Sequence, residues 1–310
     1  MKAMWFVWMF LLPVQLAAQQ YVAINLPSSL GTQFGVRGIN PGGSEIVGSY
    51  YDGVKVDGVK YSNGTFSTIA FPAGIGETAY TYASGVNDAG TVVGNVVGPS
   101  PAPVSPQYGL TYYTNQAYAT YVAPGPKMTW FNAINNQGIV AGYYQDWNCQ
   151  TSASQCNVRG FILNNGSLTT LLFPGSLQTT TAGINTLGEV AGNYETAAGS
   201  YGFTWKNGVY TEFTRVSGST LTGINDSGDL VGVHSSGAFL LSSGGALYTI
   251  SYPGSTYTSV AGIANRKGST VEVVGNYTDS NNNSHGFYAV LPLTTTASSS
   301  STPTSLLTRR

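Results

Sequence analysis

The chain has 310 residues, of which 8% are charged, and it carries a formal net charge of −1 together with 40 glycines and 21 tyrosines. This composition suits short strands and tight turns and argues against long amphipathic helices. The small net charge and the lack of any lysine or arginine run argue against nucleic acid or an anionic membrane surface as the partner, since binding to either needs clustered basic residues.

The N-terminal segment, residues 1–18, has the pattern of a secretory signal peptide. It combines one cation, Lys2, with an apolar run over residues 4–13 and a small-residue cleavage site that ends at Ala18. The run is too short to span a membrane, and an uncleaved N-terminal anchor is the alternative. No later stretch approaches 18 apolar residues, so we expect a mature chain without a membrane span that is secreted, periplasmic or on the cell surface.

The mature chain is predicted to begin with an isolated strand. Residues Gln20–Pro27 have the pattern of an outer strand and end on proline, but the strands that would precede an outer strand in a repeated unit are missing before them. The pattern matches the fourth strand of the repeated units that fill the rest of the chain.

Six repeated units of roughly 40 to 50 residues follow this strand. Each unit carries a Gly-Ile-Asn phrase or a variant of it, with starts 39 to 50 residues apart, and a second glycine follows nine to 13 residues after each start. The phrases start at Gly38, Gly85, Ala133, Gly183, Gly223 and Gly262, and the second glycines are Gly48, Gly94, Gly142, Gly192, Gly232 and Gly275. Periods of this length are typical of propellers and solenoids.

Each unit is predicted to be a meander of four antiparallel strands, A to D. Strand A ends at the Asn of the phrase and turns through Asn-x-x-Gly, as in Asn87–Gly90, where an Asx role for the Asn is favoured over a ligand role. Strand B follows, for example over Ile139–Asp146, and a loop of variable length leads to strand C. A tight turn such as Asn63-Gly64 leads to strand D, which often stops at a proline such as Pro72.

The last unit lacks a strand that the isolated first strand can supply. It provides strand A over Tyr257–Ala264, strand B over Val271–Asp279 and strand C over Gly286–Leu291, but no strand D. Pairing Gln20–Pro27 with Gly286–Leu291 closes a ring, whereas an open solenoid would leave a sheet edge unpaired at each end. The sequence therefore predicts an all-β, six-bladed β-propeller with four-stranded antiparallel blades.

The expected domain organisation follows from this closure. Residues 1–18 are a signal peptide, residues 19–292 are a single propeller, and residues 293–310 are a disordered tail rich in serine and threonine. We expect the mature protein to be a monomer.

The repeat phrases resemble those of the extracellular HAF-repeat family of bacterial exported proteins. The shared phrases are Gly-Ile-Asn, x-Val-Gly-x-Tyr and the triplet His285-Gly286-Phe287, and the resemblance covers roughly residues 21–292. It implies export and a propeller-like repeat but no reaction, because that family is known by its pattern. The chain departs from the triplet in other units, where the histidine is replaced by Tyr108, Arg159 and Tyr201.

Export would place the two cysteines in an oxidising compartment. Cys149 and Cys156 lie in one connection between strands B and C, where they could bond without strain, so we predict a disulfide. A ring this small contributes roughly 2 kcal/mol, which holds one loop rather than the fold.

The variable loops predict which face binds a ligand. In this strand order, the D-to-A and B-to-C connections share one face, and the tight A-to-B and C-to-D turns share the other. The B-to-C connections differ most in length, from almost nothing at Ser235-Ser236 to the long segments over residues 98–107 and 146–158. Variable loops on a rigid scaffold are where binding sites concentrate.

Candidate site residues follow from aligning the units on the second glycine. The ring two residues later comprises Tyr50, Val96, Tyr144, Tyr194, His234 and Tyr277, and the ring two further comprises Asp52, Gly98, Asp146, Thr196, Ser236 and Asp279. Because side chains alternate along a strand, both rings lie on the same side of their strands. One interpretation is an aromatic, polar bowl that binds a sugar or peptide through Tyr50, Asp52, Tyr144, Asp146, Trp147, Tyr194, His234, Tyr277 and Asp279. The alternative is that the tyrosines pack between blades and each aspartate caps its own turn.

No cofactor is predicted. Asp279, Asn281 and Asn283 alternate oxygen ligands as in a calcium loop, but the run lacks the Glu and the central Gly of an EF-hand, so a polar turn is favoured over a calcium site. His234 and His285 have no Cys or His partner at metal spacing, which argues against zinc.

The sequence favours a secreted, non-enzymatic binding module whose loop-rich face contacts a glycan, a peptide or a cell-surface protein. The alternative is a six-bladed hydrolase or lyase, with or without a cation, that acts on an extracellular glycan or small molecule near Asp52, Tyr277 and Asp279. Two carboxylates within about 10 Å of each other in a deep pocket would favour the enzyme, and aspartates bonded to their own loops would oppose it. A structural envelope component without a small ligand is the third hypothesis.

Overall fold

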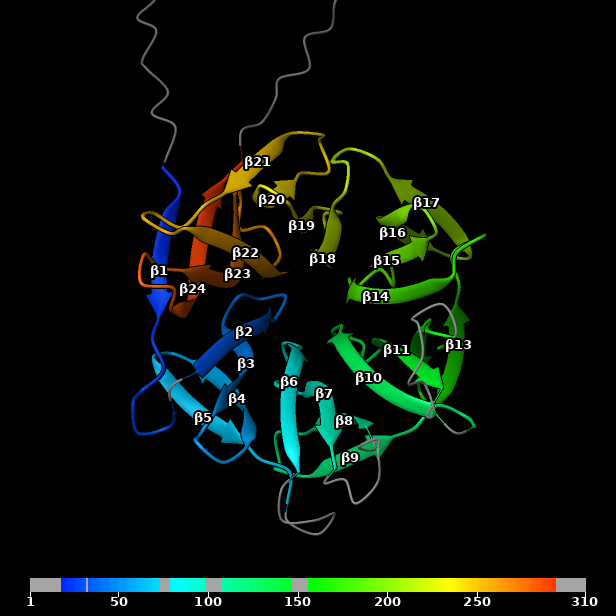
Figure 1. The fold of residues 1–310 in the computed structure, drawn as a ribbon, viewed down its shortest axis with the longest axis horizontal. Coiled ribbons are helices and arrows are strands. Elements are labelled where there is room, and N and C mark those ends of the chain that lie inside the picture. The colour runs from blue at the N-terminus through cyan, green and yellow to red at the C-terminus, as the bar shows by residue number, and fades with distance from the viewer. Residues whose placement is uncertain are drawn as a thin grey trace, which may run out of the picture.

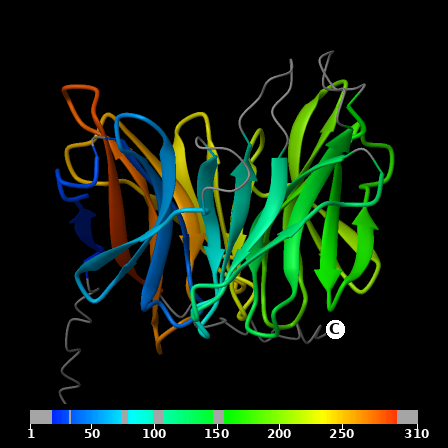
Figure 2. The ribbon, with the colours of Figure 1, turned by 90° about the horizontal axis from the view of Figure 1, so that it is seen from below.

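The computed structural model describes residues 18–31, 33–72, 79–98, 107–125, 127–146 and 156–293. These residues form six separate four-stranded antiparallel sheets arranged around a central axis (Figure 1). Seen from the side, the strands cross between the two faces of the ring (Figure 2). The predicted six-bladed β-propeller is therefore confirmed. Within the described ranges, no helix is long and apolar enough to cross a membrane.

Each blade consists of four strands that follow one another from the axis outward. Blade 1 contains β2 (Gln33–Ile39), β3 (Glu45–Tyr51), β4 (Val56–Ser62) and β5 (Thr65–Ile69), and blade 2 contains β6 (Tyr80–Val86), β7 (Val92–Val97), β8 (Gln107–Tyr112) and β9 (Tyr118–Tyr121). Blade 3 contains β10 (Lys127–Ile134), β11 (Val140–Asp146), β12 (Arg159–Asn164) and β13 (Ser167–Leu171), and blade 4 contains β14 (Gln178–Ile184), β15 (Val190–Thr196), β16 (Gly199–Lys206) and β17 (Val209–Phe213). Blade 5 contains β18 (Thr220–Ile224), β19 (Leu230–His234), β20 (Gly237–Leu241) and β21 (Leu247–Ile250), and blade 6 contains β22 (Tyr257–Ile263), β23 (Thr270–Thr278), β24 (Ser284–Pro292) and β1 (Gln20–Ile24).

The two ends of the propeller meet in blade 6, as predicted. Strand β1 pairs antiparallel with β24, with Gln20 opposite Val290 and Ile24 opposite Gly286. In Figure 1, β1 lies outside β24 and thus completes the sheet that begins at β22. The strand is shorter than predicted, because it ends at Ile24, three residues before Pro27.

The same early ending occurs in the outer strands of other blades and has a physical cause. Strand β13 ends at Leu171, and the N–H of Phe173 then donates to Oγ1 of Thr179, at 2.9 Å, in the innermost strand of the next blade. The N–H groups of Phe71 and Tyr252 donate in the same way to threonines of the following blades. The backbone has therefore left its own sheet before it reaches the proline.

The predicted turn chemistry is confirmed. Asn165 and Gly166, between β12 and β13, both have positive φ, at 46° and 81°. A turn with positive φ at both central residues matches the twist of a two-residue hairpin, and Asn-Gly is the dipeptide that tolerates it best.

In blades 2 to 5, the Asn of the repeat phrase has two structural roles, of which the sequence predicts one. Oδ1 of Asn135 accepts the N–H groups of Gln137 and Ile139, which is the predicted Asx role. Its Nδ2 also donates 2.9 Å to the carbonyl of Asn185 in the next blade. Equivalent bonds run from Asn87 to Asn135, from Asn185 to Asn225 and from Asn225 to Ala264. The repeated Asn thus joins neighbouring blades at the tight-turn face.

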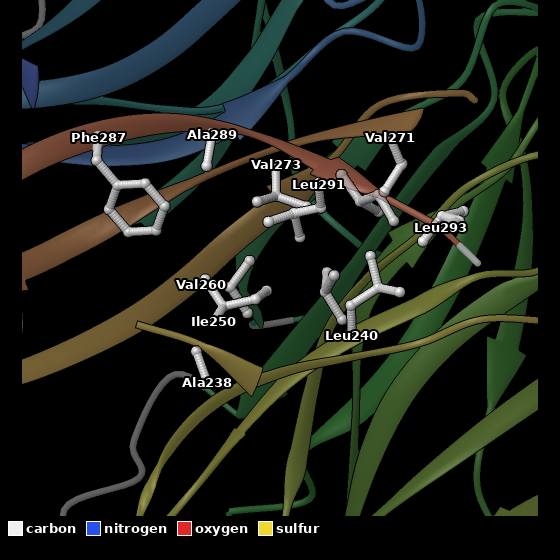
Figure 3. Packing of buried hydrophobic residues seen from close by; sticks show 12 residues of the cluster. Ala238, Leu240, Ile250, Val260, Val271, Val273, Phe287, Ala289, Leu291 and Leu293 are labelled. Carbon is white, nitrogen blue, oxygen red and sulfur yellow. The ribbon is translucent and has the colours of Figure 1, made fainter. Parts of the chain in front are cut away.

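The hydrophobic core lies between neighbouring blades. Between blades 5 and 6, Leu240 and Ile250 pack against Val260, Val273 and Leu291, and all of these side chains are buried (Figure 3). The other neighbouring blades have similar clusters. Each sheet therefore buries both faces, and no blade has a complete core alone.

An ion pair between blades 5 and 6 leads to a prediction on pH dependence. Asp229 is fully buried and accepts hydrogen bonds from Nε and Nη2 of Arg266, from the N–H of Ser243 and from Nδ2 of Asn225. Burial alone would raise the pKa of Asp229, but the donors around it outweigh this effect and lower the pKa. The stabilisation is therefore complete above the unfolded-state pKa of about 3.9 and is lost as the pH falls through the lower folded-state value.

Replacing Asp229 by asparagine should lower the free energy of unfolding by about 2 kcal/mol at neutral pH, because a charged hydrogen-bond network is lost. Urea unfolding of both proteins across acid and neutral pH measures the difference. It should shrink below about pH 3, where the native carboxyl also becomes protonated. A difference that is independent of pH would show that the charge of Asp229 does not stabilise the fold.

Candidate functional site

The structure places two of the predicted site tyrosines in packing between blades. The ring of Tyr194 stacks on Phe173, with centroids 3.8 Å and planes 7° apart, and its hydroxyl donates 2.9 Å to Glu212. Tyr277 stacks on Tyr252 with a centroid distance of 3.7 Å. Burial, before any other effect, raises the pKa of both tyrosines to about 12. Phe173 and Tyr252 both belong to the linkers that enter these blades.

Three other members of this ring make side-chain contacts within their own blades. The hydroxyls of Tyr50 and Tyr144 lie 3.0 Å and 3.1 Å from threonine hydroxyls of the outer strands. Nδ1 of His234 lies 2.9 Å from the hydroxyl of Ser236. Val96 is fully buried. Of the predicted candidates in this ring, only Tyr50 lines a cavity described below.

Two of the predicted aspartates cap their own turns. Oδ1 of Asp52 accepts the N–H groups of Val54 and Lys55, each at 2.8 Å, and the bond from Lys55 contributes most to lowering the pKa of Asp52. Oδ1 of Asp279 accepts N–H groups from Asn281 and Asn283. The backbone bond from Asn283 is the main cause of the low pKa of Asp279.

Asp146 differs from these two because its partners come from other segments. It accepts hydrogen bonds from Nζ of Lys127 in β10 and from Nδ2 of Asn157. The bond from Lys127 contributes most to lowering the pKa of Asp146. Each of the three aspartates is thus held by donors of its own blade.

The predicted calcium ligands form a hydrogen-bonded turn. Oδ2 of Asp279 accepts from Nδ2 of Asn283 at 3.1 Å and lies 3.0 Å from Nε2 of His285. Asn281 and Asn283 therefore act as donors to Asp279, which is the polar-turn alternative. Among the described residues, no group of three or more His, Cys, Asp or Glu side chains could hold a metal ion.

Part of the predicted site lies outside the described residues. Trp147 and Cys149 belong to that part, and so do most of the signal peptide and the tail. Cys156 is buried and is not a free cysteine. The disulfide between Cys149 and Cys156 stays a prediction.

A cavity along the propeller axis was not predicted. Each innermost strand contains a β-bulge, such as the register shift between Val36 and Gly38 in β2. The six residues at the bulges line the axis, and they are Arg37, Ser84, Asn132, Ala182, Thr222 and Ala261. They surround a cavity of about 500 Å³, which we call the axial pocket.

The axial pocket narrows toward the tight-turn face. The first residue of each repeat phrase lines a smaller cavity of about 70 Å³, and this ring consists of Gly38, Gly85, Ala133, Gly183, Gly223 and Gly262. Here the blades meet backbone to backbone, since a Cβ added to Gly183 would lie 3.0 Å from Cα of Gly223. A volume of this size holds about two water molecules. The narrow end therefore admits water but not a sugar or a peptide.

A second cavity, the rim groove, adjoins the axial pocket at the loop-rich face. It measures about 530 Å³ and lies between the first residues of β2, the end of β3 and the connection over residues 282–284. Arg37 lines both the rim groove and the axial pocket. The Cζ atom of Arg37 lies 5.6 Å from the centre of the Tyr82 ring, which also lines the rim groove.

Aromatic side chains continue from Tyr82 into the axial pocket. Tyr143 lines the pocket, and its ring stacks on Trp130 with centroids 4.6 Å and planes 11° apart. Burial raises the pKa of Tyr143 to about 12, although Arg37 opposes this rise. The phenol of Tyr143 is therefore neutral at physiological pH. In the described part of the chain, no aspartate or glutamate lines the rim groove or the axial pocket of about 500 Å³, and Asp226 lines only the smaller cavity at the narrow end.

A signal in the sequence could have identified these residues. Tyr143 stands one residue after the second glycine of its repeat, where other blades carry Ser49, Asn95, Asn193, Val233 and Asn276. Asn193 and Asn276 each bind the backbone of one residue in the next blade. Oδ1 accepts the N–H of that residue, and Nδ2 donates to its carbonyl. Arg37 likewise replaces the small or neutral residue found at the other bulges. Departures from the repeat on this side of the strands mark the cavity.

Comparisons with known proteins support the fold. Neither a protein-family model nor a curated protein matches the chain. Among solved structures, the β-propeller domain of the Trilobed protease from Pyrococcus furiosus has a TM-score of 0.51 and 10% identity over 84% of this chain and 83% of that one. XC5397 from Xanthomonas campestris, a gluconolactonase, has a TM-score of 0.51 and 13% identity over 89% of this chain and 91% of that one. A luciferin-regenerating enzyme has a TM-score of 0.51 and 10% identity over 89% of this chain and 96% of that one. At these identities the likeness shows the propeller fold and not the activity.

Proposed function

We propose that the protein is an exported, non-enzymatic binding module of the HAF-repeat type, and that it binds a glycan in the axial pocket and the rim groove. The observation that carries this proposal is the composition of the two cavities. They combine aromatic rings with neutral polar side chains and contain no carboxylate among the described residues.

The lining suits a sugar. Tyr82 and Tyr143 offer rings against which the apolar face of a sugar can pack, and Ser84, Asn132 and Thr180 offer hydroxyl and amide groups for hydrogen bonds. Oγ1 of Thr222, which also lines the axial pocket, is buried without a partner among the described residues. The volume of about 500 Å³ falls within the range of small-ligand sites, which combine apolar walls with a few convergent polar groups.

The hydrolase or lyase alternative has less support. A glycosidase of the common type needs two carboxyl groups that face each other across the substrate. Asp52 and Asp279 instead bond their own turns, and neither lines the two cavities. Among the described residues, the groups that line the two cavities can hold and orient a ligand, but they do not include a carboxylate pair.

Glycan-array binding of the mature protein, followed by calorimetric titration of the strongest hit, tests the proposal. Tyr82→Ala and Tyr143→Ala should each weaken binding by about fivefold or more, because an aromatic contact contributes about 1 kcal/mol. Tyr113→Ala is the matched control, since Tyr113 is 42% exposed and lines a different cavity. Thermal melts check that each variant is folded.

The other outcomes contradict the proposal in distinct ways. Release of a cleaved product would support the enzyme, and binding to a peptide library without a glycan hit would support a peptide ligand. The absence of any ligand for a folded protein would support a structural envelope component.

A further inference from the structure

Arg37 differs from the other basic residues of the described chain in its lack of a partner. Six of them form ion pairs, namely Lys55, Lys60, Lys127, Lys206, Arg266 and Lys267. Arg159 and Arg215 donate hydrogen bonds to backbone carbonyls. The guanidinium of Arg37 makes neither an ion pair nor a hydrogen bond with any described residue, and its one directed contact is with the Tyr82 ring. An arginine that braced the fold would be expected to bond as Arg159 and Arg215 do.

Arg37 also supplies the only charged side chain that lines the rim groove and the axial pocket in the described part of the chain. The nearby phenol of Tyr143 is neutral at physiological pH, as an ordinary tyrosine is, and burial raises its pKa further, to about 12. Arg37 is an exposed residue that lines the groove, so a ligand can reach it. The two cavities thus present one uncompensated positive charge beside aromatic and neutral polar groups.

We infer that Arg37 selects an acidic ligand, and that the bound glycan carries a carboxylate, as uronic acid sugars do. This inference rests on the proposed glycan-binding function. A guanidinium is charged at every physiological pH and offers paired N–H donors that match the two oxygens of a carboxylate. The Tyr82 ring, 5.6 Å from Cζ, supports the guanidinium by a cation–π contact. The neutral groups around Arg37 can bind the sugar hydroxyls.

The test compares two ligands that differ only in charge. Trigalacturonic acid and its fully methyl-esterified form are titrated into the unmodified protein and into Arg37→Gln, Arg37→Lys and Lys206→Gln. The unmodified protein should bind the acid about tenfold more tightly than the ester, which is the magnitude of a charge-assisted hydrogen bond. Arg37→Gln should abolish this preference without weakening ester binding, and Arg37→Lys should fall between the two. Lys206→Gln should keep the full preference for the acid. It also removes one positive charge, but Lys206 pairs with Glu189 and does not line either cavity.

Equal binding of acid and ester by the unmodified protein would overturn the inference, and so would an Arg37→Gln variant that weakens both ligands alike. A second result would reject the role of Arg37 alone. In that case a neutral glycan binds, Tyr143→Ala weakens its binding, and the acid binds no more tightly than the neutral glycan. If no glycan binds, the proposed function fails with it. Binding of a peptide through its C-terminal carboxylate, with no binding of the uronate, would also reject the inference.

Discussion

Replacing Ile24 by alanine is expected to lower the free energy of unfolding by about 3 kcal/mol, as for other large-to-small changes in a core. Ile24 is 4% exposed and packs in one cluster with Val36, Ile39 and Val274. It is also the last residue of β1, the strand that completes blade 6 from the opposite end of the chain. The change therefore weakens both the core and the closure of the ring.

Val22 provides the matched control for this prediction. It lies two residues earlier in the same strand, but its side chain is 57% exposed. Val22→Ala should change the free energy of unfolding by less than about 0.5 kcal/mol. Urea denaturation of the two variants measures the difference, and similar effects for both would mean that β1 adds little to the core.

Replacing Gly94 by alanine is expected to destabilise the propeller by about 3 kcal/mol or more. A Cβ at this position would lie 1.8 Å from the carbonyl oxygen and 2.9 Å from the carbonyl carbon of Tyr82 in the neighbouring strand. Both contacts are with backbone, which a rotamer change cannot relieve. Because Tyr82 lines the rim groove, any residual folded protein should also bind its glycan more weakly.

Gly35 is the control for Gly94, since it lies in β2 and a Cβ there would meet nothing within 4 Å. Gly35→Ala should leave the thermal unfolding midpoint nearly unchanged. A small effect of Gly94→Ala in the same measurement would contradict the steric explanation. The same clash recurs at the equivalent glycines, for example 2.0 Å from the oxygen of Ser259 at Gly275. This explains why each repeat carries a second glycine.

The sequence predicts the fold closely because its signals are local or repeated. Asn-Gly dipeptides specify their own turn geometry, and the repeated phrase identifies equivalent strands. The seam is predictable because one strand is missing and one is spare. The outer strands end a few residues earlier than predicted. The hydrogen bond from Phe173 to Thr179 takes the backbone away from its sheet, and because Thr179 belongs to the next blade, no local sequence pattern indicates this bond.

The site is predicted less well than the fold. The alternation of side chains along strand B places Tyr194 and Tyr277 on one side of their strands, but it does not indicate which residues they contact there. In the structure both stack on aromatic rings of the linkers between blades. Asp52 and Asp279 have the turn-capping geometry that was the alternative to a ligand role. The alignment uses positions two and four residues after the second glycine of strand B. It does not select Tyr143, which lies one residue after that glycine and so on the opposite side of the strand, or Arg37, which lies at the bulge of the innermost strand.

The sequence by itself determined the number of blades, the turns and the closing strand, because each depends on spacing along the chain or on the intrinsic conformation of a few residues. Only the tertiary structure decided which side chains face the axis, that Arg37 stands there without an acidic partner among the described residues, and that the repeated Asn links one blade to the next. These features depend on the angle between neighbouring sheets and on the bulges in the innermost strands. The angle arises only when six blades pack into one ring, whereas each bulge lies within one blade and brings its residue to the axis only in the closed ring.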